Sequence, residues 1–590
     1  MVINNYYNIT SCYGAKWSKD EGFYYISNKS GVNQIWHKDK EGNETQITFF
    51  TERIFSLNMT PNKQDILFTM DAGGNEQEQI YMINNSKIID ITQNSSARHQ
   101  YGGMKPDGKT IVFASNARNP KNFDICEMNI DTKEVKIIIQ NEDSYNIPAE
   151  LSPCGNYLLY NKLKAQSDNC LWIANLQTQQ AKNIDPTSEN AMYVSPAWKK
   201  NSQGFYFLTD KGSDFEYLAY YDMQTGKIIK VYEEKWGIEK IKLSYDDKYL
   251  AMQINRDGYS EIEILNTTTN KLISIPSAPK GVMNYFGMNW DSNSYKLLFS
   301  VTTGTRPTNV WLLDLENDLI KKVTTASLEG INKDLLAEPT LHHYKSFDDL
   351  VVPFWVYKQT SEVSPVIIDI HGGPEAQGRP MFSPLTQYLI SQGFTIVAPN
   401  VRGSTGYGKA YTYLDDIEKR LDSVKDIESL VKYLVNNNMA PKDKIAVMGA
   451  SYGGYMTLAC VANYPDLFAA GVDTVGMSNL ETFLENTAEY RRSHRETEYG
   501  SLEHHRDILR KVSPIHKVDE IIAPLMVIHG ANDPRVPVSE AEQIVQSLKD
   551  RNVPVEYLRY EDEGHGLSKR KNQLDCYPKV VEFLNKHLNK

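Results

Sequence analysis

Several features that mark membrane, nucleic-acid-binding or secreted proteins are missing from this 590-residue chain. Its apolar stretches all fall short of the roughly 18 residues that a membrane-spanning helix requires. The net charge of −11 and the lack of a long Lys/Arg block disfavour binding to a nucleic-acid phosphate backbone. The first residues have neither the basic nor the apolar region of a secretory leader, so we expect a cytoplasmic protein.

Cysteine is also scarce, with six residues scattered along the chain and no C-x-x-C pair. This usage predicts reduced thiols rather than a disulfide framework. Two histidine pairs, His342-His343 and His504-His505, invite a metal site. Adjacent histidines point apart in a strand, however, and no carboxylate spacing supports either pair. We therefore expect neither a metal nor another cofactor.

The first half of the chain instead contains a repeat. A large apolar residue, a polar turn and an apolar strand recur at intervals of 42, 45, 47, 47, 45 and 47 residues. The apolar residues that open these units are Trp17, Met59, Met104, Leu151, Trp198, Leu243 and Trp290. A second and a third strand follow within each unit, which fits four-stranded propeller blades. An irregular sandwich does not repeat at a steady interval, so the pattern predicts seven blades over roughly residues 13–325.

From about residue 336 the pattern changes to alternating strands and helices, with buried runs such as "SPVIIDIHGGP", "FTIVAPNVRGS" and "PLMVIHGAND". This alternation predicts a mostly parallel sheet with helices on both faces. A chain of this length needs more than one core. We therefore predict two domains: a seven-bladed β-propeller over residues 1–335 that gates substrates, and a catalytic α/β-hydrolase domain over residues 336–590.

A candidate nucleophile lies in "AVMGASYGGYMTLA", where Ser451 occupies the centre of a G-x-S-x-G pattern. An apolar strand precedes the serine and a helix of small and apolar residues follows it. A sharp strand-to-helix turn around a serine is the nucleophile elbow of α/β hydrolases, and its glycines allow the close approach of strand and helix. A glycine-rich turn that happens to hold a serine would match the five residues equally well. Assigning Ser451 as a nucleophile therefore requires an acid and a histidine elsewhere in the chain.

Partners follow in the expected order of Ser, Asp and His. Asp533 lies in "GANDPRVP" after the apolar strand "LMVIH", and His565 lies in "EDEGHG" after the strand "EYLRY". Parallel sheets place their chemistry at the carboxyl ends of strands, so these loops are expected to meet near Ser451. His565 would act as general base and Asp533 would hold its tautomer. A turn aspartate and an exposed loop histidine are the alternatives for either residue alone.

Acyl transfer also needs donors for the developing oxyanion. The backbone N–H of Tyr452, directly after the nucleophile, is one expected donor. The second is expected in "HGGP" at residues 371–374, from the N–H of Gly373 or, failing that, of Gly372. We interpret His371 as structural rather than as a second base.

Taken together, "HGGP", "NVRGSTGYG", "GASYGGY", "HGANDPRVP" and "EGHG" after a seven-bladed propeller resemble the prolyl oligopeptidase family of serine peptidases. The resemblance covers essentially the whole chain and points most closely to the acylaminoacyl-peptidase branch. It implies hydrolysis of short peptides beneath a propeller that excludes folded proteins. It also implies that Arg535, two residues after Asp533, binds a substrate carbonyl, unless it pairs with an acid such as Asp533 or Glu540.

The chain departs from the family pattern at two places. Prolyl oligopeptidases and dipeptidyl peptidases have tyrosine where this chain has His371, so a side-chain oxyanion donor is not expected. Dipeptidyl peptidases hold the substrate amine with paired glutamates, and Glu233-Glu234 instead fall where the outer strand of a blade ends. A carboxylesterase with the same triad and a dipeptidyl-peptidase-type exopeptidase are the alternatives. Three questions stay open: which residue is preferred at the cleavage site, from which end peptides are cut, and whether the chain forms a homo-oligomer.

Overall fold

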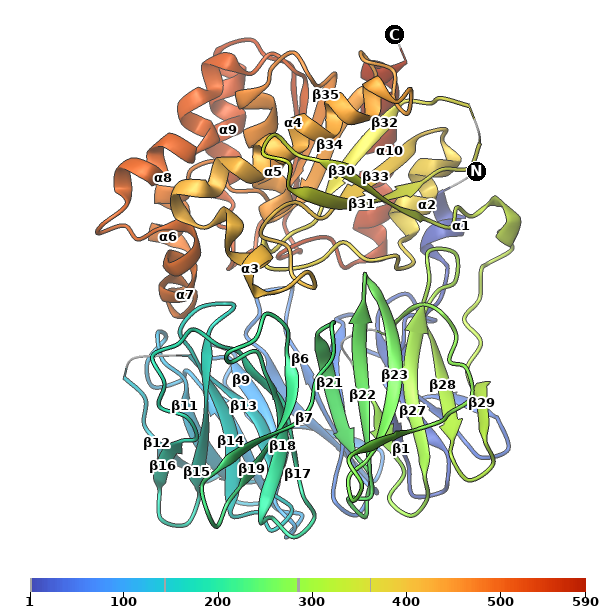
Figure 1. Cartoon of the computed structure of the whole chain (residues 1–590), viewed down its shortest axis with the longest axis vertical. Helices are drawn as coiled ribbons and strands as arrows, with labels where there is room; N and C mark the ends of the chain where they lie inside the picture. The colour runs from blue at the N-terminus through green and yellow to red at the C-terminus, as the bar shows by residue number, and fades with distance from the viewer. Residues whose placement is uncertain (1–2, 143–144, 284–286, 361, 590) are drawn as a thin grey trace.

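The computed structural model describes residues 3–142, 145–283, 287–360 and 362–589, and it has two parts stacked along the long axis (Figure 1). The lower part consists of seven small antiparallel sheets arranged around an axis, and the upper part is an eight-stranded sheet covered by helices. The predicted combination of a seven-bladed propeller and an α/β-hydrolase domain is confirmed. Among the described residues, no helix is both long and apolar enough to cross a membrane.

Each blade is a sheet made from strands that are consecutive in the chain. The first four blades are β1(Cys12–Trp17) to β4(Glu44–Gln46), β5(Ile54–Met59) to β8(Lys87–Asp90), β9(His99–Met104) to β12(Val135–Ile139), and β13(Tyr145–Leu151) to β16(Gln180–Asn183). The last three are β17(Tyr193–Trp198) to β20(Ile228–Tyr232), β21(Ile238–Leu243) to β24(Lys271–Ile273), and β25(Val282–Met283) with β26(Asn289–Trp290) to β29(Leu319–Lys322).

The seven apolar residues of the sequence repeat have a common place in this structure. Each is the last residue of a strand at the start of its blade, directly before the turn into the next strand. The tryptophans also join blades: Trp17 Nε1 donates to the carbonyl oxygen of Asn289 at 3.1 Å, which ties the first blade to the last. Trp290 Nε1 donates to the carbonyl oxygen of Lys242 at 2.9 Å. The repeat therefore marks the positions where neighbouring blades pack against each other.

The upper sheet has the strand order β30(Thr340–Lys345), β31(Val351–Tyr357), β33(Thr395–Pro399), β32(Val366–Ile370), β34(Ile445–Ala450), β35(Ala470–Thr474), β36(Leu525–Gly530), β37(Val555–Tyr560). The first two strands form an antiparallel hairpin, and the six from β33 to β37 run parallel. The central strands are apolar on both sides because helices cover both faces. Their carboxyl ends therefore form one edge, as the sequence predicts.

Two hydrophobic cores lie on opposite faces of this sheet. One contains side chains of α4(Arg420–Asn436), α5(Tyr452–Asn463), α6(Leu480–Asn486) and α8(Arg506–Val512). The other contains side chains of α2(Pro384–Ser391) and α10(Arg570–Leu588). The remaining helical elements are η1(Lys333–Leu335), α3(Lys409–Thr412), η2(Tyr413–Asp415), η3(Ile417–Lys419), α7(Glu489–Tyr499), η4(Pro514–Glu520) and α9(Ser539–Asp550).

The first helix, α1(Ile3–Tyr7), packs with the upper domain although it precedes the propeller in the chain (Figure 1). Its Tyr6 and Tyr7 rings contact Tyr388 of α2 and Tyr577 of α10, with centroids 5.6 and 5.2 Å apart. The division at residue 335 stays a prediction, but the first residues of the predicted propeller segment lie in the core of the other domain.

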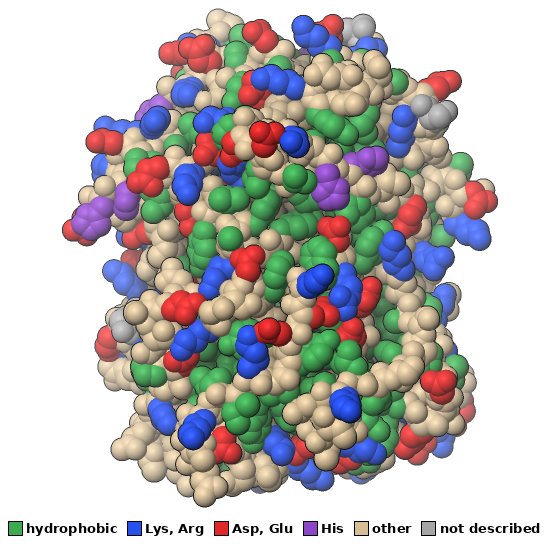
Figure 2. Space-filling view, viewed as in Figure 1, with side chains coloured by type: hydrophobic (Ala, Val, Ile, Leu, Met, Phe, Trp, Pro, Cys, Tyr) green, Lys and Arg blue, Asp and Glu red, His purple; other side chains and the backbone are tan. Residues whose placement is uncertain are grey.

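The chain enters and leaves the propeller along neighbouring segments. The N–H of Thr10 donates to the carbonyl oxygen of Ser327 at 3.1 Å, and the N–H of Ser327 donates to Thr10 Oγ1 at 2.7 Å. On the other side of the view in Figure 1, helix α7 reaches down to the propeller, where Tyr490 packs against Phe123 and Tyr145. On the face drawn in Figure 2, basic and acidic side chains lie interspersed over both domains.

Candidate active site

Ser451 lies in the turn between strand β34 and helix α5, at the carboxyl edge of the upper sheet. Its backbone has φ 60° and ψ −117°, a conformation that costs a non-glycine residue free energy and is typical of the nucleophile elbow. The flanking glycines are required by close contact: a Cβ on Gly453 would lie 2.0 Å from the carbonyl oxygen of Ile370. A Cβ on Gly449 would lie 2.5 Å from the backbone of Gly453. The strand and the helix therefore pass each other where only glycine fits.

Asp533 and His565 come together at the same edge of the sheet, in the loops that follow β36 and β37. The distance from His565 Nδ1 to Asp533 Oδ2 is 2.6 Å. The aspartate carboxylate is fully buried, whereas the imidazole keeps 14% of its surface exposed. A buried carboxylate on Nδ1 fixes the tautomer that leaves Nε2 free to accept a proton. The two loops that the sequence predicts to meet therefore do meet.

The other oxygen of Asp533 accepts two backbone hydrogen bonds, from the N–H groups of Arg535 at 2.8 Å and Val536 at 3.1 Å. Burial alone would raise the pKa of this carboxyl. His565 and the backbone donors outweigh burial and hold the pKa of Asp533 below its ordinary value. The group is therefore held as a carboxylate, which is the form that can orient and stabilise an imidazolium.

His529, the last but one residue of β36, lies behind this pair and was not singled out from the sequence. Its Nε2 donates to the carbonyl oxygen of Val536 at 2.9 Å and lies 3.7 Å from Asp533 Oδ2. Burial lowers the pKa of His529, so the ring is held neutral. It supports the loop that carries Asp533. The only signal in the sequence is a polar residue in an otherwise apolar strand.

The two expected oxyanion donors are the N–H of Tyr452, next to the nucleophile in the chain, and the N–H of Gly373 in the glycine loop. Tyr452 is the first residue of α5, where backbone N–H groups have no partner within the helix. The glycine loop after β32 contacts the elbow directly, because a Cβ on Gly372 would lie 3.4 Å from the Cβ of Ser451. Gly373 has φ 131°, which side-chain-bearing residues rarely adopt. The close approach to Ser451 is thus shown for Gly372, the alternative donor, and the assignment to Gly373 stays a prediction.

His371 has a structural environment, as the sequence interpretation holds. Its Nε2 forms a 2.8 Å hydrogen bond with Ser404 Oγ, and Nδ1 lies 2.8 Å from the carbonyl oxygen of Gly372. Burial lowers the pKa of this ring as well. Both ring nitrogens are therefore used in holding the glycine loop in place.

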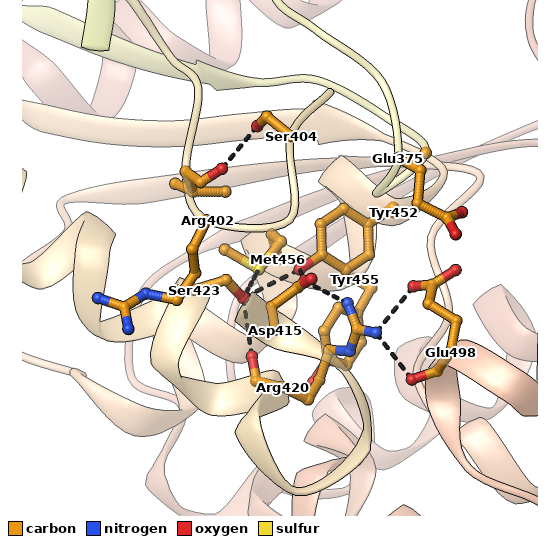
Figure 3. Close-up of polar contacts among 12 residues, drawn as sticks. Glu375, Arg402, Ser404, Asp415, Arg420, Ser423, Tyr452, Tyr455, Met456 and Glu498 are labelled. Carbon is orange, nitrogen blue, oxygen red and sulfur yellow. Dashed lines mark hydrogen bonds and ion pairs between the residues drawn. The ribbon is translucent and has the colours of Figure 1, made fainter. Parts of the chain in front are cut away.

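The side chain of Tyr452 is fully buried and lies in a polar network (Figure 3). Its hydroxyl donates to Asp415 at 3.0 Å and forms a 2.9 Å hydrogen bond with Ser423. Arg420 pairs with Asp415 and, at 2.8 Å, with Glu498. The Arg420 guanidinium also lies 5.3 Å from the Tyr452 ring centroid, within the range of a cation–π contact. This network fixes the first turn of α5, and hence the N–H beside Ser451.

Arg535 does not pair with the acids expected from the sequence. Its Nε donates to the carboxylate of Glu76, in the propeller loop between β6(Ile66–Met70) and β7(Gln79–Asn84). Only its backbone N–H contacts Asp533, and Glu540 accepts hydrogen bonds from Ser478 and Asn479 instead. The arginine side chain is 41% exposed, so the ion pair leaves part of the guanidinium accessible.

Glu233 and Glu234 follow the outer strand β20, as the sequence analysis expects. Glu233 pairs with Lys230, and Glu234 lies 2.8 Å from Arg256 Nη2. Arg256 also contacts Glu263 at 2.8 Å. Both glutamates are therefore engaged in ion pairs at the outside of the blades.

A cavity of about 470 Å³ lies between the two domains. Propeller residues line one side of it and residues of the segments that follow β32 and β33 line the other, including Ser167, Asp210, Glu216, Glu239, Glu375, Arg379 and Lys409. We call it the interdomain cavity. Its lining includes Glu375, three residues after Gly372 in the chain, but none of Ser451, Asp533 and His565. Its lining combines acidic and basic side chains with apolar ones such as Met192, Phe215 and Met283.

Comparison with known proteins gives two matches to family models. The model described as the prolyl oligopeptidase family matches residues 380–590, and that described as the prolyl oligopeptidase N-terminal beta-propeller domain matches residues 51–326. Together the two matches span most of the chain.

Individual relatives agree with this result. The dipeptidyl peptidase family member 6 of Caenorhabditis elegans is 26% identical over 96% of this chain and 83% of its own length. The acylamino-acid-releasing enzyme of Arabidopsis thaliana is 29% identical over 39% of this chain and 31% of its own length. A puromycin-hydrolyzing peptidase of Mycobacterium tuberculosis has the same fold, with a TM-score of 0.87, 18% identity and coverage of 100% of this chain and 96% of its own.

Proposed function

The chain belongs to the prolyl oligopeptidase family of serine peptidases, and from that premise we propose that Ser451, His565 and Asp533 form its catalytic triad. The observation that carries the proposal is the 2.6 Å contact between His565 Nδ1 and Asp533 Oδ2 at the sheet edge that holds the strained Ser451. The backbone N–H groups of Tyr452 and Gly373 complete the site as oxyanion donors.

The reaction follows from these roles. Ser451 Oγ attacks the scissile carbonyl carbon while His565 Nε2 takes its proton, and the carbonyl oxygen becomes an oxyanion held by the two N–H groups. The C–N bond then breaks, the imidazolium returns its proton to the leaving amine, and an acyl-enzyme remains on Ser451. Water attacks this ester with His565 again as base, which releases the acid and restores the serine. Asp533 stays ionised throughout and stabilises the imidazolium.

We propose that the substrates are short peptides. The support is the propeller stacked against the catalytic domain, together with an interdomain cavity whose volume of about 470 Å³ suits a few residues rather than a folded domain. Arg535, which remains 41% exposed beside the triad loop, is proposed to hold a backbone carbonyl of the substrate.

The proposal is tested by covalent labelling. A fluorophosphonate probe should label the native protein once, and Ser451→Ala should remove both the label and peptidase activity, with a loss on the order of 10⁶ in kcat. Ser547→Ala is the matched control, since this serine donates to the carbonyl oxygen of Gln543 within helix α9. Retained activity in Ser451→Ala would falsify the assignment.

Two alternatives use the same triad. A carboxylesterase would hydrolyse small esters but leave peptides intact, so peptide cleavage separates it from a peptidase. An exopeptidase that releases amino-terminal fragments is favoured by the relative named as a dipeptidyl peptidase, which aligns with almost the full chain. The relative named for acylamino-acid release aligns over a smaller share of this chain.

We further propose a cytoplasmic location, supported by six free thiols, and leave homo-oligomer formation to measurement.

A further inference from the structure

Two cavities follow the axis of the propeller. The first strands of the blades lie innermost, where they contact one another, whereas the fourth strands are largely exposed. Residues of the first, second, sixth and seventh blades line a cavity of about 290 Å³, and residues of the second, third, fourth and sixth blades line one of about 540 Å³. Asn58 and Lys242 line both, so the cavities adjoin. We call the two together the axial channel.

The smaller cavity of the axial channel is lined by positive charge. Lys16 comes from β1, and Lys240 and Lys242 come from β21. Each of these strands has a bulge just before its first lysine, and a bulge commonly redirects a side chain. Among the described residues, the lining of this cavity contains no acidic side chain. Three ammonium groups from two blades therefore share one small space.

The carboxylate nearest to these lysines is already engaged. Glu150 lines the larger cavity, and its Oε1 accepts a 3.1 Å hydrogen bond from Lys242 Nζ. Its Oε2 accepts a 2.9 Å hydrogen bond from the backbone N–H of Trp198. Lys242 nevertheless keeps 40% of its side-chain surface accessible, as expected for a group that faces a channel. Glu150 therefore serves one lysine and one blade contact, and leaves no oxygen for Lys16.

The ammonium group of Lys16 makes no hydrogen bond or ion pair with any residue that the structure describes. Glu239, which precedes Lys240 in the chain, accepts a 2.7 Å hydrogen bond from Arg379. Burial, followed by repulsion from Lys242 and Lys240, lowers the pKa of Lys16 to about 8. Burial likewise lowers the pKa of Lys240 to about 8, although Glu239 opposes the shift. Positive charge is thus concentrated here without a matching anion.

An anion of limited size fits this arrangement. Ammonium groups are compact point charges that bind phosphate and carboxylate oxygens. A space of about 290 Å³ admits one such group with water around it but excludes a polyanion such as a nucleic acid. Lys240 also lines the interdomain cavity, so the axial channel and that cavity meet at this residue.

We propose that Lys16, Lys240 and Lys242 form a binding site for a small oxyanion in the axial channel, separate from the proposed triad. The bound anion supplies the negative charge that Lys16 lacks. Inorganic phosphate and the carboxylate of a peptide fragment share this chemistry. Phosphate would enter from solvent, whereas a peptide carboxylate would arrive from the interdomain cavity.

The experiment is calorimetric titration of the full chain with inorganic phosphate, at an ionic strength held constant with sodium chloride. We expect one phosphate per chain. Lys16→Met keeps the apolar stem but removes the ammonium, and should weaken binding by about 10- to 100-fold. Lys271→Met, at an exposed position on the outer strand of the blade that holds Lys240, is the matched control and should stay within about twofold of native.

A thermal measurement separates a ligand site from a structural role. Lys16→Met removes repulsion between ammonium groups, so its Tm without phosphate should equal or exceed the native value, while the rise in Tm with phosphate should be lost. A lower Tm without phosphate would identify Lys16 as a structural residue and count against the site. Absence of saturable phosphate binding, or native affinity in Lys16→Met, would overturn the inference.

Competition on the native chain covers a variant that fails to fold and identifies the source of the anion. Sulfate should displace phosphate, and equal displacement by chloride would reduce the effect to ionic screening and overturn the site. N-acetyl-alanine and N-acetyl-alaninamide differ in one negative charge. Displacement by the acid alone supports a peptide carboxylate as the ligand, displacement by neither supports inorganic phosphate, and displacement by the amide contradicts recognition of charge.

Discussion

The guanidinium of Arg535 donates across the domain interface to the carboxylate of Glu76, 459 residues away in the chain. Burial alone would raise the pKa of Glu76, but Arg535 and then Arg98 outweigh it and hold the pKa below its ordinary value. The ion pair joins the loop that carries Asp533 to the second propeller blade. It also places the one arginine proposed to contact substrate at the boundary of the two domains.

The first prediction separates these two roles of Arg535. If it holds a peptide carbonyl, Arg535→Ala should lower kcat/KM for peptides by about 1.5–3 kcal/mol, the range for a charge-assisted hydrogen bond. A p-nitrophenyl ester offers no such carbonyl and should lose little. Glu76→Gln keeps the arginine and should cost peptides less than Arg535→Ala does. If both variants lose equally, and on both substrates, the arginine serves only the domain contact.

The second prediction concerns the tautomer of His565. Asp533→Asn keeps the shape of the side chain but presents an amide to Nδ1, which favours the wrong tautomer and should lower kcat by a factor on the order of 10⁴. Fluorophosphonate labelling of Ser451 should slow in parallel. Asp349→Asn, at an exposed hairpin residue, is the control and should be indistinguishable from the native enzyme. Activity within tenfold of native in Asp533→Asn would show that His565 needs no such partner.

The third prediction separates the backbone of Tyr452 from its side chain. Tyr452→Phe keeps the N–H at the start of α5, so kcat/KM should stay within about threefold of native. The variant leaves Asp415 and Ser423 without the hydroxyl, and the free energy of unfolding should fall by about 1–3 kcal/mol. Chemical denaturation and steady-state kinetics measure the two effects. A large loss of kcat with unchanged stability would instead identify the hydroxyl as a catalytic group.

The fourth prediction is a pH dependence of stability. Burial raises the pKa of Asp473, beneath helix α5, from an ordinary value near 3.8 to about 7. Between about pH 4 and 7 the folded state therefore binds the proton more tightly than the unfolded state, so this group makes stability fall as pH rises through that window. Asp473→Asn does not titrate, and the slope should diminish by up to about 1.4 kcal/mol per pH unit. Urea denaturation at pH 5 and pH 7 gives the slopes, and equal slopes would contradict the assignment.

The fifth prediction concerns substrate size. Unstructured peptides should be cut, whereas the same sequence within a stable folded protein should resist, since the propeller lies over the sheet edge (Figure 1). The same protein after denaturation and digestion into fragments is the control and should be degraded. Efficient digestion of the native folded protein would show that the propeller does not restrict access.

The sequence predicts the fold well where the signal is local. The seven residues from Trp17 to Trp290 each mark a blade because packing between neighbouring blades demands a large apolar side chain at one repeating position. The strand–serine–helix pattern around Ser451 and the strand ends before Asp533 and His565 are equally local. The meeting of Asp533 and His565 follows from the rule that parallel strands end at one edge.

The contacts missed are those between distant segments. Arg535 meets Glu76, and Glu375 meets Glu498 and Ser167, only because the two domains and helix α7 come together in space. No periodicity or motif records such a contact in a single sequence. For Glu233 and Glu234 the sequence analysis expected the end of an outer blade strand, and the structure places them there, each paired with a basic residue.

The placement of helix α1 has a mechanical consequence. Helix α1 packs in the core of the upper domain, so two neighbouring connections, hydrogen-bonded to each other at Thr10 and Ser327, join the propeller to that domain. Helix α7 and the Arg535–Glu76 ion pair add contacts across the same interface. Removing the first ten residues should therefore weaken the attachment of the two domains to each other and leave the blades intact.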